Sequence, residues 1–155
     1  MSVIADASAA QRAATDPGAS VWVAASAGSG KTKVLSDRVL SLLLSGTRPE
    51  RILCLTFTRA AAAEMAMRVN NHLARWATAS DAAVGDEIAA LLGEAADSAR
   101  LDGARRLFAQ VLDVPGGLKI QTIHAFCQSL LGRFPLEAGI APHFEAMDER
   151  SAAEL

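Results

Sequence analysis

The strongest chemical signal in the sequence is a glycine-rich run that ends in lysine and threonine, Ala25-Ser26-Ala27-Gly28-Ser29-Gly30-Lys31-Thr32. Glycine adopts backbone torsions that other residues avoid, so Gly28 and Gly30 can turn amide N–H groups toward a phosphate. Lys31 can reach the β- and γ-phosphate oxygens of a nucleotide, and the Thr32 hydroxyl can ligate Mg²⁺. The run therefore predicts a phosphate-binding loop, or P-loop, for a nucleotide.

A P-loop needs a strand before it and a helix after it. Val21 to Ala25 is apolar and predicts a short buried strand. Lys31 to Leu44 has apolar residues at positions that suit a helix packed on a sheet. The amino end of that helix would add its positive dipole end to the phosphate site. The general pattern has glycine where this chain has Ala25, so we expect a slightly different entry into the loop.

Two further segments place polar and aromatic residues where a predicted strand meets a predicted helix. Thr56 and Phe57 close the predicted buried strand 51–57, and Thr58 stands between it and the predicted helix 59–77. Thr122 and His124 stand in the same way between the predicted strand 118–123 and the predicted helix 124–134. Ligands bind at the carboxyl ends of parallel strands. Hydroxyls and helix amides suit phosphodiester contacts, and an aromatic ring can stack on a base.

These residue types leave other roles open. Phe57 and Phe126 could belong to the core instead of forming a platform for bases. His124 could be a capping or buried histidine, and Gln11 could be an ordinary surface glutamine.

The order of elements predicts an α/β protein. Strand, helix, strand and helix in succession favour a right-handed βαβ unit on a parallel sheet. Residues 78–114 hold two amphipathic helical patterns, 82–96 and 99–113, with no chemical motif. The segment 137–155 has no strong pattern.

Composition sets the broad class. The chain has 155 residues, with 51% hydrophobic and 21% charged, which fits one globular domain. A formal charge of −2 excludes a strongly basic protein that coats nucleic acid. We expect Cys54 and Cys127 to be reduced and buried. The longest apolar stretch, 39–44, is too short to span a bilayer, and the first residues do not form a secretory signal, so we expect a soluble cytoplasmic protein without a membrane partner.

On these motifs and their order, the chain resembles the superfamily 1 DNA helicases of the UvrD/RecB kind. More narrowly it resembles the AddA branch, helicase–nuclease subunits that process double-strand DNA ends in bacteria. The similarity covers about residues 11–149. It is carried by the P-loop in its alanine-first form, by Thr56-Phe57-Thr58-Arg59-Ala60-Ala61-Ala62-Ala63-Glu64-Met65, and by LKIQTIHAFCQSLLGRFPLEA from Leu118 to Ala138.

The resemblance implies roles for single residues. Gln11 matches the glutamine that recognises adenine, while Lys31 and Thr32 match the residues that hold phosphate and magnesium. Thr56, Phe57 and Thr58 match the first single-stranded-DNA motif, and Thr122 and His124 match the second. The implied cofactors are ATP and Mg²⁺. The implied partners are single-stranded DNA, DNA ends and an AddB-type subunit.

The resemblance also implies a domain plan. Residues 1–155 match the amino-terminal part of the first RecA-like, P-loop NTPase domain, in which a parallel sheet is flanked by helices, and 78–114 match a helical insertion. An acidic motif for Mg²⁺ and water is missing, because Asp148-Glu149 does not end a hydrophobic strand. The arginines of a second RecA-like domain and a nuclease domain are also missing. We therefore expect a truncated domain, a fragment that is inactive alone.

Two other functions remain open from the residues. A small P-loop phosphotransferase, such as a metabolite kinase, would place arginines over the phosphates, and Arg100, Arg105 and Arg106 are the candidates. A non-catalytic nucleotide-binding module is the third reading. ATP-dependent retention on single-stranded DNA would separate the helicase from both.

Overall fold

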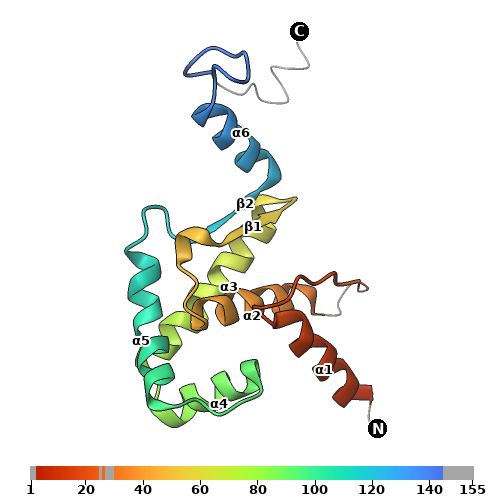
Figure 1. Ribbon diagram of the computed structural model, residues 1–155, viewed down its shortest axis with the longest axis vertical. Helices are drawn as coiled ribbons and strands as arrows, with labels where there is room; N and C mark the ends of the chain where they lie inside the picture. Colours follow the sequence, from red (N-terminus) through yellow and green to blue (C-terminus); the bar gives the residue numbers. More distant parts are fainter. Residues whose placement is uncertain (1–2, 25, 27–29, 145–155) are drawn as a thin grey trace.

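The computed structural model describes residues 3–24, 26 and 30–144 (Figure 1). Its regular elements follow one another as α1 (Val3–Thr15), α2 (Lys31–Leu44), the 3₁₀ turn η1 (Pro49–Arg51), β1 (Leu53–Thr56), α3 (Arg59–Thr78), α4 (Asp81–Leu92), α5 (Ser98–Leu112), β2 (Lys119–Thr122) and α6 (Ile123–Arg133).

The sheet consists of β1 and β2, which pair in parallel. Leu53 lies opposite Lys119, and Thr56 lies opposite Thr122, so both strands end at the same edge. The connection between them runs through α3, α4 and α5. The expectation of an α/β chain with a parallel sheet is thus confirmed at the level of two paired strands and their helices.

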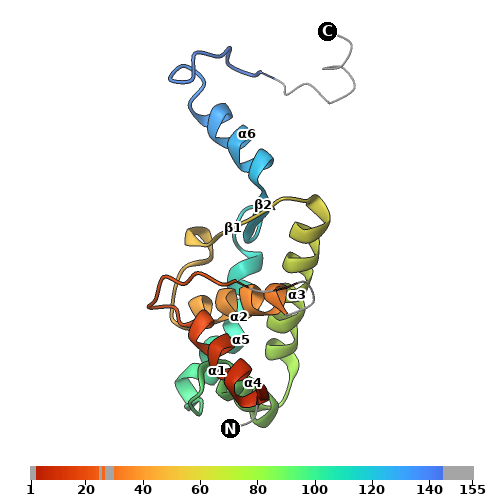
Figure 2. The same cartoon turned by 90° about the vertical axis from the view of Figure 1, so that its right-hand side faces the viewer.

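The core lies between α2, α3, α4 and α5, which Figure 2 shows packed below the sheet. Val69, Leu73 and Trp76 of α3 are essentially inaccessible to solvent. Their main partners are the apolar faces of the other three helices: Val39, Leu40 and Leu43 of α2, Val84 and Ile88 of α4, and Ala104, Leu107 and Val111 of α5. The two helices that the sequence predicts between residues 78 and 114 therefore share one core with the P-loop helix.

The predicted helices form close to their expected bounds because their ends carry capping residues. The N-cap residues of α3, α4, α5 and α6 each accept, through a side-chain oxygen, a backbone N–H of the first turn; these residues are Thr58, Ser80, Asp97 and Thr122. Gly93 ends α4 in the left-handed conformation, with a φ of 79°. The cap residues and the apolar period point to the same helix boundaries.

The predicted strand over 21–25 is wrong for its described residues. Residues 21–24 have no regular structure, and the Trp22 side chain is 92% exposed. A strand needs a neighbour to complete its hydrogen bonds, but β1 and β2 pair only with each other in the described sheet. The chain before this segment is instead held by Arg38, whose guanidinium donates to the carbonyls of Ala14, Asp16 and Ala19 at 3.1, 2.8 and 2.6 Å.

Three further expectations need correction. The strand predicted as buried over 51–57 forms only at Leu53–Thr56, and Leu53 and Leu55 are exposed. Cys127 is exposed, while Cys54 is half-buried, and burial raises the pKa of the Cys54 thiol. Helix α1, whose residues are mostly small, is not expected from the sequence. No helix among the described residues has the length and apolarity that crossing a membrane requires.

Candidate functional site

The amino end of α2 has the form that a P-loop requires. The helix begins at Lys31, and its N-cap is Gly30, whose φ of 84° lies in the left-handed region that favours glycine. Gly30 has no side chain to cap the helix, unlike the N-caps of α3 to α6. The first turn of α2 also has no acidic residue. The positive end of the helix dipole is therefore not neutralised by its own first turn, which fits an anionic ligand.

The two residues that the sequence predicts for phosphate and magnesium stand in this first turn. The Lys31 ammonium donates to the carbonyl of Ser26 at 2.5 Å, so the lysine turns back over the loop. Thr32 is half-buried, and its carbonyl accepts from the buried Ser36 hydroxyl at 2.9 Å. The predicted loop residues Ala25, Ala27, Gly28 and Ser29 lie outside the described residues. Ser26 and Gly30, on either side of the gap, are described.

Gln11 lies beside the loop, although nineteen positions separate it from Gly30 in the sequence. A methyl group built on Gly30 would stand 3.7 Å from the Gln11 amide nitrogen. Next to Gln11 there is a cavity of about 240 Å³, lined by Gln11, Arg12, Thr15, Lys33, Asp37, Ala89, Ala90 and Leu91. The residue predicted to read the base thus lies at the phosphate loop and at the mouth of a cavity.

The two predicted DNA motifs come together at the carboxyl edge of the sheet, where Thr56 and Thr122 are register partners. Thr58 accepts the Ala61 N–H and Thr122 accepts the Ala125 N–H, both at 3.1 Å, so these hydroxyls start α3 and α6. The Thr56 hydroxyl donates to the Thr58 carbonyl at 3.0 Å. A hydroxyl that accepts a bond in a cap retains its own proton to donate, which suits a phosphate oxygen.

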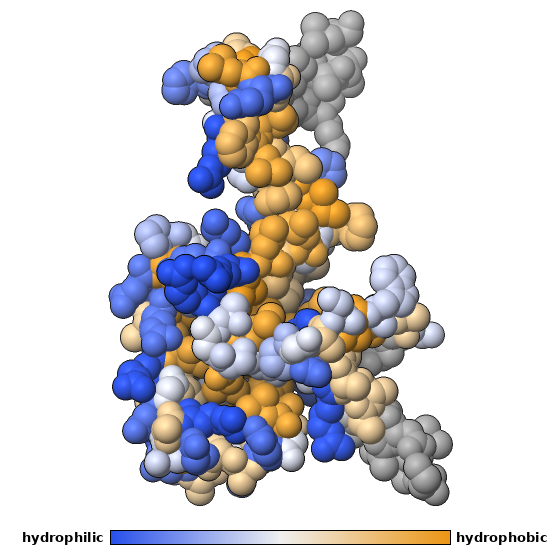
Figure 3. Space-filling model, in the orientation of Figure 1, coloured by the Kyte–Doolittle hydropathy of each residue, from blue (hydrophilic) through white to orange (hydrophobic). Residues whose placement is uncertain are grey.

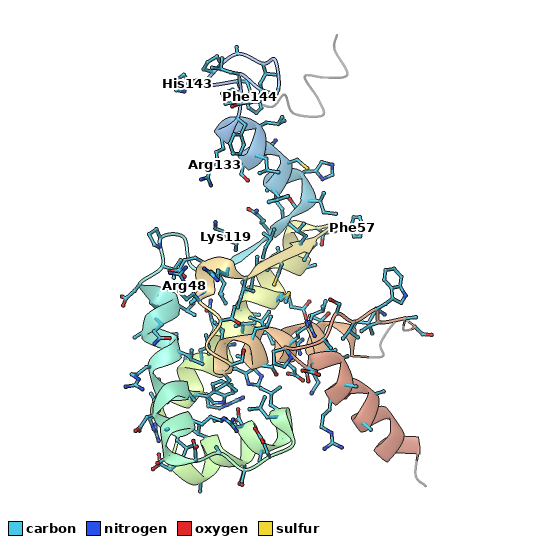
Figure 4. The ribbon with its side chains drawn as sticks, in the orientation of Figure 1. Arg48, Phe57, Lys119, Arg133, His143 and Phe144 are labelled. Carbon is cyan, nitrogen blue, oxygen red and sulfur yellow. The ribbon has the colours of Figure 1, made fainter. Side chains whose placement is uncertain are left out.

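Phe57 stands at this edge as a surface residue. Its side chain is 85% exposed and points away from the body of the molecule (Figure 4). The reading of Phe57 as a core residue is therefore wrong, whereas Phe126 is half-buried in α6. His124 is exposed in the first turn of α6, so the reading of a buried histidine is also wrong. In the same view Arg48, Lys119 and Arg133 lie on the other flank, away from Phe57.

Two of the three arginines that a phosphotransferase reading would need, Arg100 and Arg105, have structural roles on α5. Arg105 donates to the carbonyls of Trp76 and Ala79 at 3.3 and 2.8 Å and pairs with Asp81 at 2.5 Å. Arg100 pairs with Glu94 at 2.8 Å. These two arginines close the end of α3 and the loop after α4 instead of covering a phosphate site. The phosphotransferase reading has no support from their positions.

A second polar cluster ties α4 to α3. The Glu87 carboxylate accepts from the Trp76 indole at 2.7 Å and pairs with Arg75 at 2.8 Å. Burial raises the pKa of Glu87, but the bonds from Trp76 and Arg75 and the charges of Arg75 and His72 outweigh this effect. The net result is a pKa below the usual value. Within the described ranges, no three His, Cys, Asp or Glu side chains gather as metal ligands would.

Sequence reasoning missed the residues of α4 that line the cavity beside Gln11. Ala89, Ala90 and Leu91 have no chemistry of their own, so a search for motifs passes over them. Only the packing of α4 against α1 and α2 brings them to this place. Arg12 and Asp37 were also missed, since each looks like an ordinary surface charge in the sequence.

The chain is similar to known helicase domains and helicase/nuclease subunits. The model of the UvrD/REP helicase N-terminal domain matches residues 7–155. Proteins named as subunits of an ATP-dependent helicase/nuclease are similar over most of the chain. The one from Lactobacillus acidophilus is 32% identical over 145 residues, which is 94% of this chain and 10% of the relative. Those from Lactobacillus johnsonii and Pelotomaculum thermopropionicum are 35% and 36% identical, over 93% and 88% of the chain and 10% and 9% of the relatives. The chain spans about a tenth of the length of these relatives.

Proposed function

The chain belongs to the family of UvrD/REP helicase N-terminal domains, and from this premise we propose that it is the ATP- and DNA-binding part of an ATP-dependent DNA helicase. The relatives are named helicase/nuclease subunits, so we extend the proposal to double-strand break repair and recombination. The nuclease activity and an AddB-type partner subunit belong to the same proposal for the longer protein, as does its action in the cytoplasm on DNA ends.

ATP fits the residues around the amino end of α2. The uncapped helix start at Gly30 suits the phosphates, and Lys31 supplies a positive charge from the same turn. We assign the Thr32 hydroxyl to Mg²⁺, and the loop residues Ala25, Ser26, Ala27, Gly28 and Ser29 to the phosphates. Gln11 would read adenine, because an amide can donate to a ring nitrogen and accept from the exocyclic amine. Hydrolysis of bound ATP supplies the free energy for movement along DNA.

Single-stranded DNA fits the carboxyl edge of the sheet. Phe57 offers an exposed ring for stacking on a base. Thr58, Thr122 and His124 offer donors to the phosphodiester backbone beside it, and the positive ends of α3 and α6 face the same edge. The Thr56 hydroxyl, which donates to the Thr58 carbonyl, offers lone pairs there or exchanges that bond for one to a phosphate. In Figure 1 the carboxyl end of β1 and the amino end of α2 face the same side of the molecule. ATP and DNA would therefore bind on one side.

The finer fold is also part of the proposal. We infer a RecA-like P-loop NTPase arrangement for residues 1–155, with 78–114 as a helical insertion. Two observations support it: a parallel strand pair with helical crossover, and a helix that starts at the lysine of the P-loop.

The register match of Thr56 and Thr122 carries the proposal, because it brings two motifs from distant parts of the chain to one edge. The test is the fluorescence anisotropy of a labelled single-stranded oligonucleotide with and without a magnesium complex of a non-hydrolysable ATP analogue. We expect binding to the oligonucleotide, with an affinity that changes when the analogue is added. A metabolite kinase or an inert nucleotide-binding module would give no nucleotide-dependent change, and that result would overturn the helicase proposal.

A further inference from the structure

We propose that α4, whose sequence carries no motif, forms a wall of the pocket that holds the base of the nucleotide. Ala89, Ala90 and Leu91 would contact the base, and the position of α4 would thereby depend on the nucleotide. This inference rests on the proposed function, since it assigns a further part of the same nucleotide site.

The position of the cavity suits the base of a nucleotide bound at the P-loop. Its walls come from three helices: Gln11, Arg12 and Thr15 from α1, Lys33 and Asp37 from α2, and Ala89, Ala90 and Leu91 from α4. Lys33 is two residues after Lys31 and Asp37 is about one helical turn further, so the cavity runs beside the first turns of the P-loop helix. Gln11 joins the cavity to Gly30. A nucleotide whose phosphates sit at the start of α2 can therefore place its base here.

The chemistry of the cavity lining also suits a purine base. A purine base has two apolar faces and a polar edge. The α4 side of the cavity is apolar, while the α1 side carries the Gln11 amide and the Arg12 guanidinium. The α2 side carries the ion pair of Lys33 with Asp37 at 2.6 Å. Pockets for small molecules commonly combine an apolar wall with a few polar groups in this way.

Helix α4 is held by contacts at its carboxyl end and along the side that faces α3. Its last residues are followed by Gly93, and a methyl group built there would stand 3.8 Å from an Arg12 guanidinium nitrogen. The Arg12 charge thus lies beside the end of α4, where the helix dipole is negative. On its other side α4 is tied to α3 through Glu87, which bonds to Trp76 and Arg75. Helix α3 in turn has Thr58 as its N-cap, at the proposed DNA edge. A ligand that contacts α4 would thus affect a helix that is hydrogen-bonded to α3.

The test compares ATP with tripolyphosphate, which has phosphates but no base. The variant Ala90→Trp places a large ring at the cavity wall, and Ala82→Trp places the same ring on an exposed position of α4 outside that wall. With isothermal titration calorimetry in the presence of Mg²⁺, we expect Ala90→Trp to weaken ATP binding by about tenfold or more, the equivalent of about 1.4 kcal/mol. Its tripolyphosphate affinity should equal that of the parent chain, and Ala82→Trp should leave both affinities unchanged.

The outcomes separate this inference from the proposed function. Unchanged ATP affinity in Ala90→Trp, or an equal loss for ATP and tripolyphosphate, would overturn the role of α4. Failure of the parent chain to bind either ligand would overturn the nucleotide site itself. Circular dichroism shows whether Ala90→Trp folds. If it does not, Ala90→Leu takes its place with the same pair of ligands and the same criterion.

Discussion

Phe57 and Lys31 represent the two kinds of residue on which the proposed site depends. Phe57 is a large apolar side chain that remains in solvent, so its presence at the sheet edge gives no burial energy to the fold. Lys31 is a charge that bends back to the carbonyl of Ser26, over the loop it is proposed to serve. Both residues can therefore be changed with little effect on the core between α2 and α5.

We predict that Phe57→Ala weakens binding to single-stranded DNA by about 1–3 kcal/mol, the value of one base–aromatic stack. The melting temperature should barely change, because the ring is exposed. Anisotropy titrations with the parent chain, Phe57→Ala and Phe57→Tyr measure the effect, and the tyrosine variant should retain most of the affinity. Phe134→Ala is the matched control, since Phe134 is a partly exposed ring after the end of α6. A loss of thermal stability with unchanged DNA affinity would contradict the assignment.

We predict that Lys31→Ala abolishes detectable binding of Mg-ATP. The variant removes the positive side chain at the start of α2. The attraction between this charge and the β- and γ-phosphate oxygens supplies much of the binding energy at such a site. Calorimetric titration of the chain with Mg-ATP measures the loss. Lys119→Ala removes an exposed lysine at the start of β2 and should bind as the parent does. Equal ATP affinity in Lys31→Ala and the parent would refute the P-loop assignment.

The sequence identified the residue types of the site but not their exposure. From its residue type alone Phe57 is expected in a core more often than on a platform for bases. The short β1 leaves the ring beyond the last paired residue, Thr56. Gln11 carries no local signal that it meets Gly30, because that contact depends on how α1 packs against α2. Ala89 and Ala90 give no chemical signal at all.

Helices α2 and α3 were predicted well, because the residues that determine a helix lie within its own segment of the chain. The helices over 31–44 and 59–77 formed almost within their expected bounds, because the apolar period is helical in both and Thr58 caps the start of the second. The strand predicted over 21–25 did not form at its described residues, 21–24. A strand depends on a partner elsewhere in the chain, and an apolar run of five residues contains no information about that partner.

The contact between α3 and α4 depends on Glu87 and therefore on pH. Its pKa is below the usual value of 4.5 in the folded chain, so the unfolded state binds the proton more readily. The stabilisation is present above about pH 4.5 and is lost as the pH falls through the lowered pKa of the folded state. We predict that Glu87→Gln lowers the melting temperature near neutral pH, and that its difference from the parent shrinks as the pH falls below about 4.5.

Thermal melts followed by circular dichroism between about pH 3 and about pH 7, a range that includes that value, measure this prediction. Glu94→Gln is the matched control, because Glu94 is an exposed carboxylate that pairs with Arg100 outside the α3–α4 contact. A difference between Glu87→Gln and the parent that stays constant over the whole range would contradict the role assigned to the charge of Glu87.

The surface of the whole molecule shows where apolar residues remain uncovered. Figure 3 shows hydrophobic side chains running from the sheet along α6. The exposed residues there are Leu53, Leu55, Ile123, Leu130, Leu131 and Phe134. In the described part of the chain, α6 has no buried residue. The sequence predicts a buried strand at β1 because its residues are apolar on both faces of the sheet. The sequence does not reveal which of these two faces is covered by a helix.

We predict that the 155-residue chain hydrolyses ATP negligibly, even with single-stranded DNA present. The P-loop can hold the phosphates and Thr32 can hold the metal. The residues that follow the two described strands are Phe57, Thr58 and Arg59 after β1, and Ile123, His124 and Ala125 after β2. None of these six is a carboxylate, so neither strand end can orient an attacking water. An arginine that contacts the γ-phosphate contributes roughly 10³–10⁵ in rate to related nucleotide hydrolases, and Arg100 and Arg105 of α5 are engaged with carbonyls and carboxylates instead.

Steady-state phosphate release by the purified chain measures this prediction, with Lys31→Ala as the blank. We expect the two rates to be equal within error, while ATP binding by the parent chain remains measurable, because the loop amides and Lys31 are close together in the sequence. Binding without turnover separates the two halves of the site: the groups that hold the phosphates lie at the start of α2, and those that activate water must come from elsewhere. Turnover well above the blank would show that a carboxylate of this chain orients water, and Asp148→Asn and Glu149→Gln would be the first variants to identify it.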